Sequence, residues 1–267
     1  MIESSANGQY KRIQKLMKQS RARRQEGVFV VEGWKMVKEA LRRQLVIQLY
    51  AAEREADRAK EQLAQERDRA PGLEIMTEAL FRQLSDTVTP QGILAIVKMP
   101  VYDRKEILTD PEAKLLCLED IQDPGNLGTM IRTAEGAGMS GIILSRGCVD
   151  LFNPKVVRST MGSLFRVPFY VCGDLAGEMS DLQAQGFSFY AAHLRGMRDY
   201  QEQTYEGRVG LLIGNEANGL TDPVTERSDS LVKIPMEGEL ESLNAAVSAA
   251  LLMYEVRRQK GRRKPSL

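Results

Sequence analysis

The stretch LLIGNEANGLTDPVTERSDSLVKIPMEGELESLNAAVSAALLMYE, Leu211–Glu255, decides the fold of this 267-residue chain. Two short apolar runs, Val209–Ile213 and Leu231–Ile234, are each followed by a polar loop of Gly, Asn, Glu or Ser residues. Short apolar strands that alternate with helices indicate a parallel sheet. Ligands bind such sheets beyond the carboxyl ends of the strands. We therefore expect the two polar loops to form a binding site.

The same alternation extends back to Leu115 and predicts an α/β fold. Further strands are predicted at Leu115–Glu119, Gly141–Leu144, Val167–Val171 and Phe187–Ala192. Helices are predicted at Leu127–Ala137, Pro154–Ser163, Leu175–Gln185 and Ser242–Gln259. Because strands and helices follow one another in turn, helices should cover both faces of a parallel sheet.

A second, smaller α/β unit is predicted upstream. Its helices are predicted at Tyr10–Arg24, Trp34–Arg43, Glu53–Arg69 and Glu78–Leu84, and its strands at Val28–Val31, Leu45–Ala51, Leu73–Met76 and Gly92–Lys98. Residues 100–113 are polar and contain Pro100 and Pro111, so we interpret them as a linker. The predicted domains are residues 1–99, the linker 100–113, and residues 114–267.

The composition excludes several classes of protein. No run of about 18 apolar residues exists, which excludes a membrane span, and the polar N-terminus does not look like a signal peptide. Cys117, Cys148 and Cys172 are scattered, which argues against a disulfide framework and a zinc site and fits a cytoplasmic protein. The single histidine, His193, excludes a multi-histidine metal site, and in an apolar strand we expect it to be structural. No metal is therefore predicted.

The formal net charge of +1 hides two basic ends. Residues 11–24 contain no acid and several basic residues: Lys11, Arg12, Lys15, Lys18, Arg21, Arg23 and Arg24. The tail carries Arg257, Arg258, Lys260, Arg262, Arg263 and Lys264. Such patches can bind nucleic-acid phosphates. Charge alone fits equally well with solvated helix faces.

A glycine pattern at Gly136–Gly141 matches G-x-G-x-x-G, but its context excludes a dinucleotide fingerprint. The fingerprint must follow a strand and open a helix. Here the glycines end a predicted helix and enter a strand, so we interpret them as a C-cap and turn. This argues against a nicotinamide-dependent dehydrogenase.

Five polar residues near the predicted strand ends are candidates for chemistry. Asn126 can N-cap the helix that follows it, and Ser242 can do the same for the last helix. Capping explains neither Arg132, whose fork can hold a phosphate, nor Asn244. A plain turn would explain the glycines of Gly214–Leu220 but does not require Glu216.

Three segments resemble the motifs of the SpoU family of RNA ribose 2′-O-methyltransferases, within the SPOUT superfamily. They are NLGTMIRTAEGAG at Asn126–Gly138, GNEANGL at Gly214–Leu220 and IPMEGELESLNAAVSAAL at Ile234–Leu251. The N-terminal unit, with FVVEG at Phe29–Gly33, resembles the family's ribosomal-protein-like α/β/α substrate-binding domain. The resemblance implies a parallel sheet with a trefoil knot, and a homodimer whose active sites are completed across the interface.

The resemblance also implies transfer of a methyl group from S-adenosylmethionine to a ribose 2′-hydroxyl of structured RNA, with 23S ribosomal RNA expected. It assigns the catalytic frame to Asn126, Arg132, Glu216, Ser242 and Asn244. Cofactor contacts are expected from Gly214, Asn215, Ile234, Met236 and Leu243, and RNA contacts from Arg21, Arg23 and Arg24.

The family's proton-transfer role falls on Arg132. An arginine with a pKa above about 12 holds its proton, so we assign this residue first to orienting the 2′-oxygen and phosphate. Two alternatives stay open: an inactive RNA-binding protein of the same fold, and a transfer-RNA 2′-O-methyltransferase.

Overall fold

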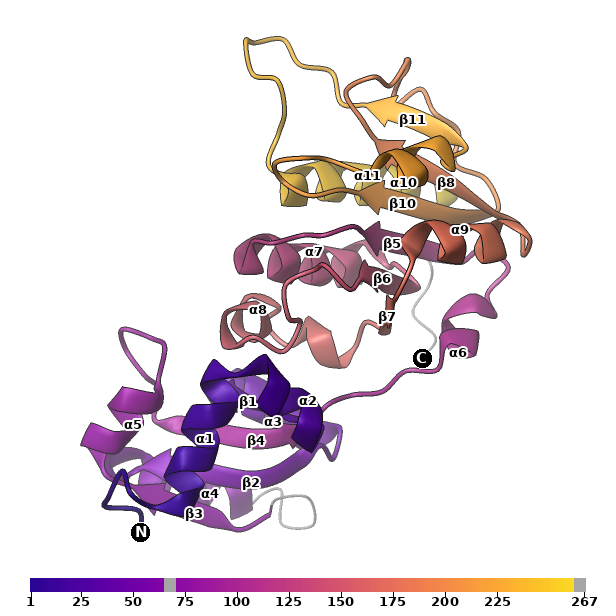
Figure 1. Ribbon diagram of the computed structural model, residues 1–267. Coiled ribbons are helices and arrows are strands. Elements are labelled where there is room, and N and C mark those ends of the chain that lie inside the picture. Colours follow the sequence, from indigo (N-terminus) through magenta and orange to yellow (C-terminus); the bar gives the residue numbers. More distant parts are fainter. Residues whose placement is uncertain (65–70, 262–267) are drawn as a thin grey trace. The chain divides into compact units, whose positions relative to one another are not determined.

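Two units with different kinds of sheet make up residues 1–64 and 71–261, the part of the chain that the computed structural model describes (Figure 1). The N-terminal unit comprises Met1–Val101 and Asp150–Phe165, and the C-terminal unit comprises Tyr102–Val149 and the chain from Arg166 onward. The end of the predicted helix Glu53–Arg69 and the basic residues Arg262, Arg263 and Lys264 lie outside the described residues.

The N-terminal unit contains a mixed sheet with strand order β1-β4-β2-β3. Its strands are β1 Val28–Glu32, β2 Val46–Ala52, β3 Leu73–Met76 and β4 Ile93–Lys98. Strand β4 runs antiparallel to β1 and β2, whereas β2 and β3 are parallel. Its helices are α1 Gly8–Lys18, α2 Ser20–Glu26, α3 Trp34–Arg42, the 3-10 turn η1 Glu53–Glu55, α4 Ala56–Ala64 and α5 Glu78–Leu84.

Alternating residues of β1 bury both faces of this sheet. Val28 and Val30 belong to the core that α1 and α5 cover. Phe29 points the opposite way, as alternation in a strand requires, and its ring lies 4.8 Å from that of Phe152 and 6.0 Å from that of Phe165. The unit is therefore a sheet with a packed layer on each face.

The prediction of a single helix over Tyr10–Arg24 is wrong. Gln19 has an extended backbone and separates α1 from α2. The break turns Arg23 inward, where it is only 3% exposed. Its Nη1 donates to the carbonyl of Leu16 at 2.6 Å and to that of Met17 at 3.2 Å. The last carbonyls of a helix lack partners within the helix, so Arg23 caps α1.

The segment Asp150–Phe165 is part of the N-terminal unit, although the sequence assigned it to the catalytic domain. It carries α8 Pro154–Ser159 and the 3-10 turn η2 Ser163–Phe165. Asp150 accepts a hydrogen bond of 3.0 Å from Nε of Arg23. This part-buried ion pair and the tilted ring contacts with Phe29 attach the segment to the N-terminal sheet.

The C-terminal unit is built on a seven-stranded sheet with strand order β7-β6-β5-β10-β8-β11-β9. Its strands are β5 Lys114–Leu118, β6 Gly141–Ser145, β7 Phe169–Cys172, β8 Phe187–Ala192, β9 Arg198–Asp199, β10 Arg208–Ile213 and β11 Ser230–Lys233. Every pairing among them is parallel, which confirms the predicted sheet type. The knot stays a prediction.

Helices cover both faces of this sheet. They are α6 Arg104–Leu108, α7 Pro124–Ala137, α9 Leu175–Gln183, α10 Asp222–Glu226 and α11 Ala245–Lys260. Helices α6, α9 and α10 share one core with Cys117 and Phe189. Helices α7 and α11 lie side by side (Figure 1), and α11 also contacts β10.

The predicted linker is not wholly irregular. Residues Arg104–Leu108 form α6 because Ile107 and Leu108 are buried in the core of the C-terminal unit. None of the helices in the described ranges is long and apolar enough to cross a membrane.

Candidate active site

The loop after β10 is closed by backbone hydrogen bonds. The N–H groups of Asn215 and Gly219 donate to each other's carbonyls at 3.0 and 2.9 Å. A Cβ on Gly214 would lie 2.2 Å from the carbonyl carbon of Gly219, so only glycine fits there. The Asn215 side chain accepts from the amides of Ala217 and Asn218 and donates to the Asp120 carbonyl at 2.8 Å. These contacts give the loop one shape and fix it to the end of β5.

Glu216, at the tip of this loop, accepts hydrogen bonds from the segment before α7. The backbone N–H groups of Gln122 and Asp123 donate to its carboxylate at 3.0 and 3.1 Å, and Nδ2 of Asn126 donates at 3.0 Å. Burial alone would raise the pKa of Glu216, but these hydrogen bonds outweigh it and hold the pKa below its ordinary value. Glu216 is therefore an ionised acceptor that joins two motifs.

The two helices at the site are capped by residues other than those predicted. Asp123, not Asn126, caps α7, with Oδ1 accepting from the Asn126 N–H at 2.7 Å. Asn244, not Ser242, caps α11 by accepting from the amides of Ala246 and Val247. Capping thus explains the backbone role of Asn244 and frees the Asn126 side chain for other contacts.

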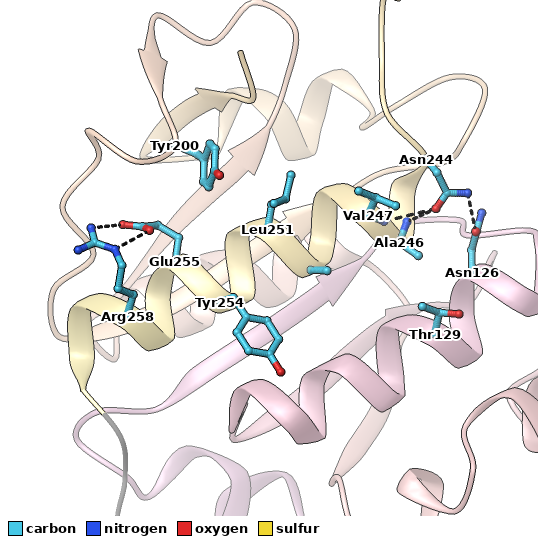
Figure 2. A pocket seen from close by; sticks show the side chains of 11 residues that line it. Asn126, Thr129, Tyr200, Asn244, Ala246, Val247, Leu251, Tyr254, Glu255 and Arg258 are labelled. Carbon is cyan, nitrogen blue, oxygen red and sulfur yellow. Dashed lines mark hydrogen bonds and ion pairs between the residues drawn. The ribbon is translucent and has the colours of Figure 1, made fainter. Parts of the chain in front are cut away.

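A chain of hydrogen bonds links all three motifs. Nδ2 of Asn244 donates to Oδ1 of Asn126 at 2.9 Å (Figure 2), and Nδ2 of Asn126 donates to Glu216. Backbone amides donate at both ends, to Asn244 and to Glu216, and this sets the orientation of both side-chain amides. The network Asn244–Asn126–Glu216 is the polar centre of the site.

A buried carboxylate missed at the sequence level holds the far end of the loop. Glu119 is 7% exposed and directly follows β5. Its two oxygens accept from the N–H of Thr221 at 2.8 Å and from its Oγ1 at 2.7 Å. The loop is thus anchored at Asn215, Glu216 and Thr221. The signal available in the sequence was an acid directly after an apolar strand.

A cavity of about 740 Å³ lies beyond the ends of β8, β10 and β11. All five residues predicted to contact the cofactor line it: Gly214, Asn215, Ile234, Met236 and Leu243. Glu216 and Ser242 also line it, as do His193 and Asp199. The sequence reasoning missed His193, which follows β8 and does not lie within a strand. The cavity is the site expected for a ligand of an open α/β sheet.

A second hollow, a groove of about 710 Å³, runs along α11 and α7 (Figure 2). Asn126 and Asn244 lie at one end of it, and Val247, Leu251 and Tyr254 line its length. Val247 and Tyr254 are each 48% exposed. An apolar groove therefore adjoins the polar network.

Comparison with known proteins identifies the two units. Residues 113–254 match the SpoU rRNA Methylase family, and residues 7–95 match the MRM3-like substrate binding domain. The chain belongs to the SpoU rRNA methylase family.

Full-length relatives support this assignment. The chain is 35% identical to the Bacillus subtilis 23S rRNA (guanosine(2553)-2′-O)-methyltransferase RlmP, over 96% of this chain and 98% of the relative. It also resembles the AdoMet-bound rRNA methyltransferase of Sinorhizobium meliloti, with a TM-score of 0.86, 31% identity and coverage of 96% and 97%. The SpoU methyltransferase AviRb of Streptomyces viridochromogenes, in complex with AdoMet, gives a TM-score of 0.84, 28% identity and coverage of 95% and 98%.

Four of the five predicted catalytic residues lie in the hydrogen-bonded network or on the cavity wall, and Arg132 lies outside both. Asn126, Glu216 and Asn244 form one network, and Ser242 is exposed at the cavity wall. Arg132 is exposed on α7 and lines neither hollow. Within residues 1–64 and 71–261, no hydrogen bond or ion pair engages its guanidinium. Arg132 is therefore a cation available to a ligand.

The three arginines predicted to bind RNA differ in exposure. Arg21 and Arg24 are exposed on α2. Arg23 is buried in its ion pair with Asp150, so its assignment as an RNA contact is wrong for this structure. A basic sequence pattern alone could not separate the three.

Proposed function

We propose that this SpoU methylase transfers a methyl group from S-adenosylmethionine to the ribose 2′-hydroxyl of a guanosine in 23S ribosomal RNA. The observation that carries the proposal is the network Asn244–Asn126–Glu216 at the edge of the strand-end cavity. The nucleoside and the RNA are those in the name of the full-length B. subtilis relative. The match over the full length of an rRNA enzyme favours ribosomal over transfer RNA as the substrate, and the intact polar network argues against an inactive RNA-binding protein.

The cavity suits a cofactor held mainly by backbone groups. At Gly214 there is no room even for a Cβ, so the main chain itself forms this part of the wall. Glu216 and Glu241 place carboxylates on the lining, which fits a ligand that carries a positively charged sulfonium. When bound, S-adenosylmethionine supplies the methyl group. We assign its contacts to Gly214, Asn215, Ile234, Met236 and Leu243.

Residues of the first motif, Asn126–Gly138, and of the third, Ile234–Leu251, would orient the acceptor. The methyl group must lie in line between the ribose oxygen and the sulfur, and such positioning accounts for much of the rate. Arg132 would hold the RNA phosphate or the 2′-oxygen through its planar fork. Asn126 and Asn244 are fixed by their network and each keeps one amide hydrogen for a ligand. Ser242 would complete the frame from the cavity wall.

The proton of the 2′-hydroxyl needs an acceptor. Glu216 is a poor candidate, because its lowered pKa makes the carboxylate a weak base at neutral pH. Its hydrogen bonds point to a positioning role. Arg132 stays assigned first to orientation of the 2′-oxygen and second to proton transfer.

The N-terminal unit would bind the RNA substrate. It matches a substrate-binding domain, and Arg21 and Arg24 offer exposed cations on α2. Contacts with phosphates supply affinity that falls with salt. These two arginines are therefore assigned to RNA, without Arg23.

The apolar groove along α11 would bind a second copy of the chain. Val247 and Tyr254 are seven residues apart, so both lie on the same side of α11. Exposed apolar patches of this kind mark interaction surfaces. Because Asn126 and Asn244 lie at one end of the groove, a partner there would reach the edge of the active site.

The direct test in cells is a map of ribose methylation. Total RNA from cells with and without the gene is compared for 2′-O-methyl groups at every nucleotide. We expect one guanosine of 23S rRNA to lose its methyl group when the gene is absent. Loss of a methyl group from transfer RNA alone would contradict the proposed substrate.

A further inference from the structure

The single histidine lies at the central strand end of the cofactor cavity. Strand β8 is flanked in the sheet by β10 and β11, whose loops carry the assigned cofactor contacts. Leu212 pairs with Ala191, and Val232 pairs with Ala192. Continuing this parallel register places His193 level with Gly214 on one side and Lys233 on the other. His193 therefore lies between the two loops that line the cavity on either side.

A tight turn fixes the backbone of His193. Its N–H donates to the Val232 carbonyl at 2.9 Å, and its carbonyl accepts from the Gly196 N–H at 2.9 Å. A Cβ on Gly196 would lie 2.6 Å from the backbone nitrogen of Lys233, so the turn requires glycine. The histidine is thus held in place by its own turn and by β11.

The ring has a defined tautomer. Nδ1 accepts a hydrogen bond of 3.0 Å from the N–H of Arg195, so it carries a lone pair. In a neutral imidazole the proton then lies on Nε2. Nε2–H is the one ring donor left for a ligand in the cavity that His193 lines.

Burial and one nearby cation favour this neutral form. Burial first, and then the charge of Arg195, lower the pKa of His193 below its ordinary value. Asp199 and Lys233 line the same cavity and pair with each other at 3.5 Å. The other charged residues of the lining are Glu216 and Glu241.

We propose that neutral His193 donates a hydrogen bond from Nε2–H to the adenosine part of bound S-adenosylmethionine. The inference rests on the proposed function and adds a residue to its cofactor site. Adenosine carries neutral ring-nitrogen and ribose-oxygen acceptors, which suit a neutral donor. The cofactor's carboxylate would instead favour a protonated ring. Protonation of His193 would also break its hydrogen bond with the Arg195 N–H.

The proposal predicts the direction in which pH changes affinity. If the bound ligand holds His193 neutral, binding lowers the pKa of the ring. Affinity is then constant above the pKa of the free protein and falls as the pH decreases from there to the lower pKa of the complex. A pKa lowered by one unit on binding corresponds to about a tenfold loss of affinity across that range.

Nuclear magnetic resonance can follow this directly, because the chain has one histidine. The His193 Cε1–H signal of the full-length protein is titrated with pH, with and without saturating S-adenosylhomocysteine. This ligand lacks the sulfonium charge, so simple charge repulsion from the sulfur is excluded. We expect a lower pKa in the complex. An unchanged or raised pKa in the complex would overturn the proposal.

Calorimetry with three variants supplies the second readout. His193→Ala should weaken S-adenosylhomocysteine binding by about five- to tenfold, the scale of one neutral hydrogen bond. His193→Gln keeps a neutral donor, so it should retain most of the affinity but lose the pH dependence. Gln185→Ala, two residues before the start of β8 and away from the cavity lining, is the matched control and should bind like wild type.

The outcomes separate the two claims. Wild-type affinity of His193→Ala, with a folded protein by thermal unfolding, would overturn the role of His193 alone. Absence of binding heat with both S-adenosylmethionine and S-adenosylhomocysteine would overturn the proposed function, and this inference with it.

Discussion

Nδ2 of Asn244 donates a hydrogen bond of 2.9 Å to Oδ1 of Asn126, across 118 residues of sequence. The same Asn126 donates to Glu216. The first residue of the motif Asn126–Gly138 therefore links the motif Gly214–Leu220 to the motif Ile234–Leu251. Asn244 in turn caps α11, whose orientation is thereby tied to the site. Three short motifs are thus joined into one hydrogen-bonded polar unit.

This relationship predicts that Asn126 and Asn244 are energetically coupled. Asn126→Ala and Asn244→Ala should each lower single-turnover methyl transfer by about a hundredfold, the scale of a misplaced reacting group. Because either change breaks the same network, the double variant should lose little more than the worse single variant.

A matched control separates this effect from lost capping. Asn7 caps α1 in the N-terminal unit, so Asn7→Ala removes a comparable cap away from the site. It should lower stability without lowering turnover of the folded enzyme. Fully multiplicative losses in the double variant would contradict the coupling.

Two glycines of the loop after β10 should respond differently to substitution. Gly214→Ala forces a Cβ onto the backbone of Gly219, so we expect the loop to open and binding of S-adenosylmethionine to be lost in calorimetry. Gly219 has a φ of +71° but open space around a Cβ. Gly219→Ala should therefore cost about 1–2 kcal/mol of backbone strain and keep measurable binding. Equal affinities of the two variants would argue against this loop as the cofactor wall.

Substitutions in α2 should distinguish a structural arginine, Arg23, from two arginines that bind RNA, Arg21 and Arg24. Arg23→Met leaves Asp150 without its partner and should lower the free energy of unfolding by on the order of 3 kcal/mol. Arg21→Gln with Arg24→Gln should leave stability near wild type, weaken RNA binding and flatten its salt dependence. Thermal unfolding and filter binding at several salt concentrations measure both. An unchanged salt slope in the double variant would identify these two arginines as ordinary surface charge.

The groove along α11 should hold a second copy of the chain. Val247→Glu places a charge on the apolar lining, so sedimentation should shift from dimer to monomer. Val171→Glu is the matched control, because Val171 is 55% exposed on β7 and does not line the groove. A monomeric wild-type protein at micromolar concentration would contradict the dimer.

Much of the fold followed from apolar patterning, because buried parallel strands appear as short continuous apolar runs. The residues that cap helices did not follow, because Ser, Asp and Asn are all good N-caps. Asp123 caps α7, whereas the Asn126 side chain donates a hydrogen bond to Glu216, some 90 residues away in sequence. Local pattern carries no information on such a bond.

The sequence also did not show which charged residues are buried. Arg21, Arg23 and Arg24 look alike in sequence, yet only Arg23 meets a carboxylate from the segment Asp150–Phe165. His193 was expected to be structural because it directly follows the apolar run Phe187–Ala192, and the sequence did not show that the cavity opens at this point. Both errors concern contacts between segments distant in the chain.

The measurement that tests the account most directly is in-vitro methylation of unmodified 23S rRNA with labelled S-adenosylmethionine, followed by alkaline hydrolysis. A ribose 2′-O-methyl group protects the adjoining phosphodiester bond, so the label should remain in one alkali-resistant dinucleotide that contains guanosine. Under single-turnover conditions with saturating RNA and cofactor, Arg132→Ala should lower the rate by about two to four orders of magnitude while folding and cofactor binding persist. Arg132→Lys should rescue little, because it lacks the planar fork. Label in alkali-sensitive nucleotides, or no label at all, would contradict ribose methylation by this protein, and a near-normal rate for Arg132→Ala would contradict the role of Arg132.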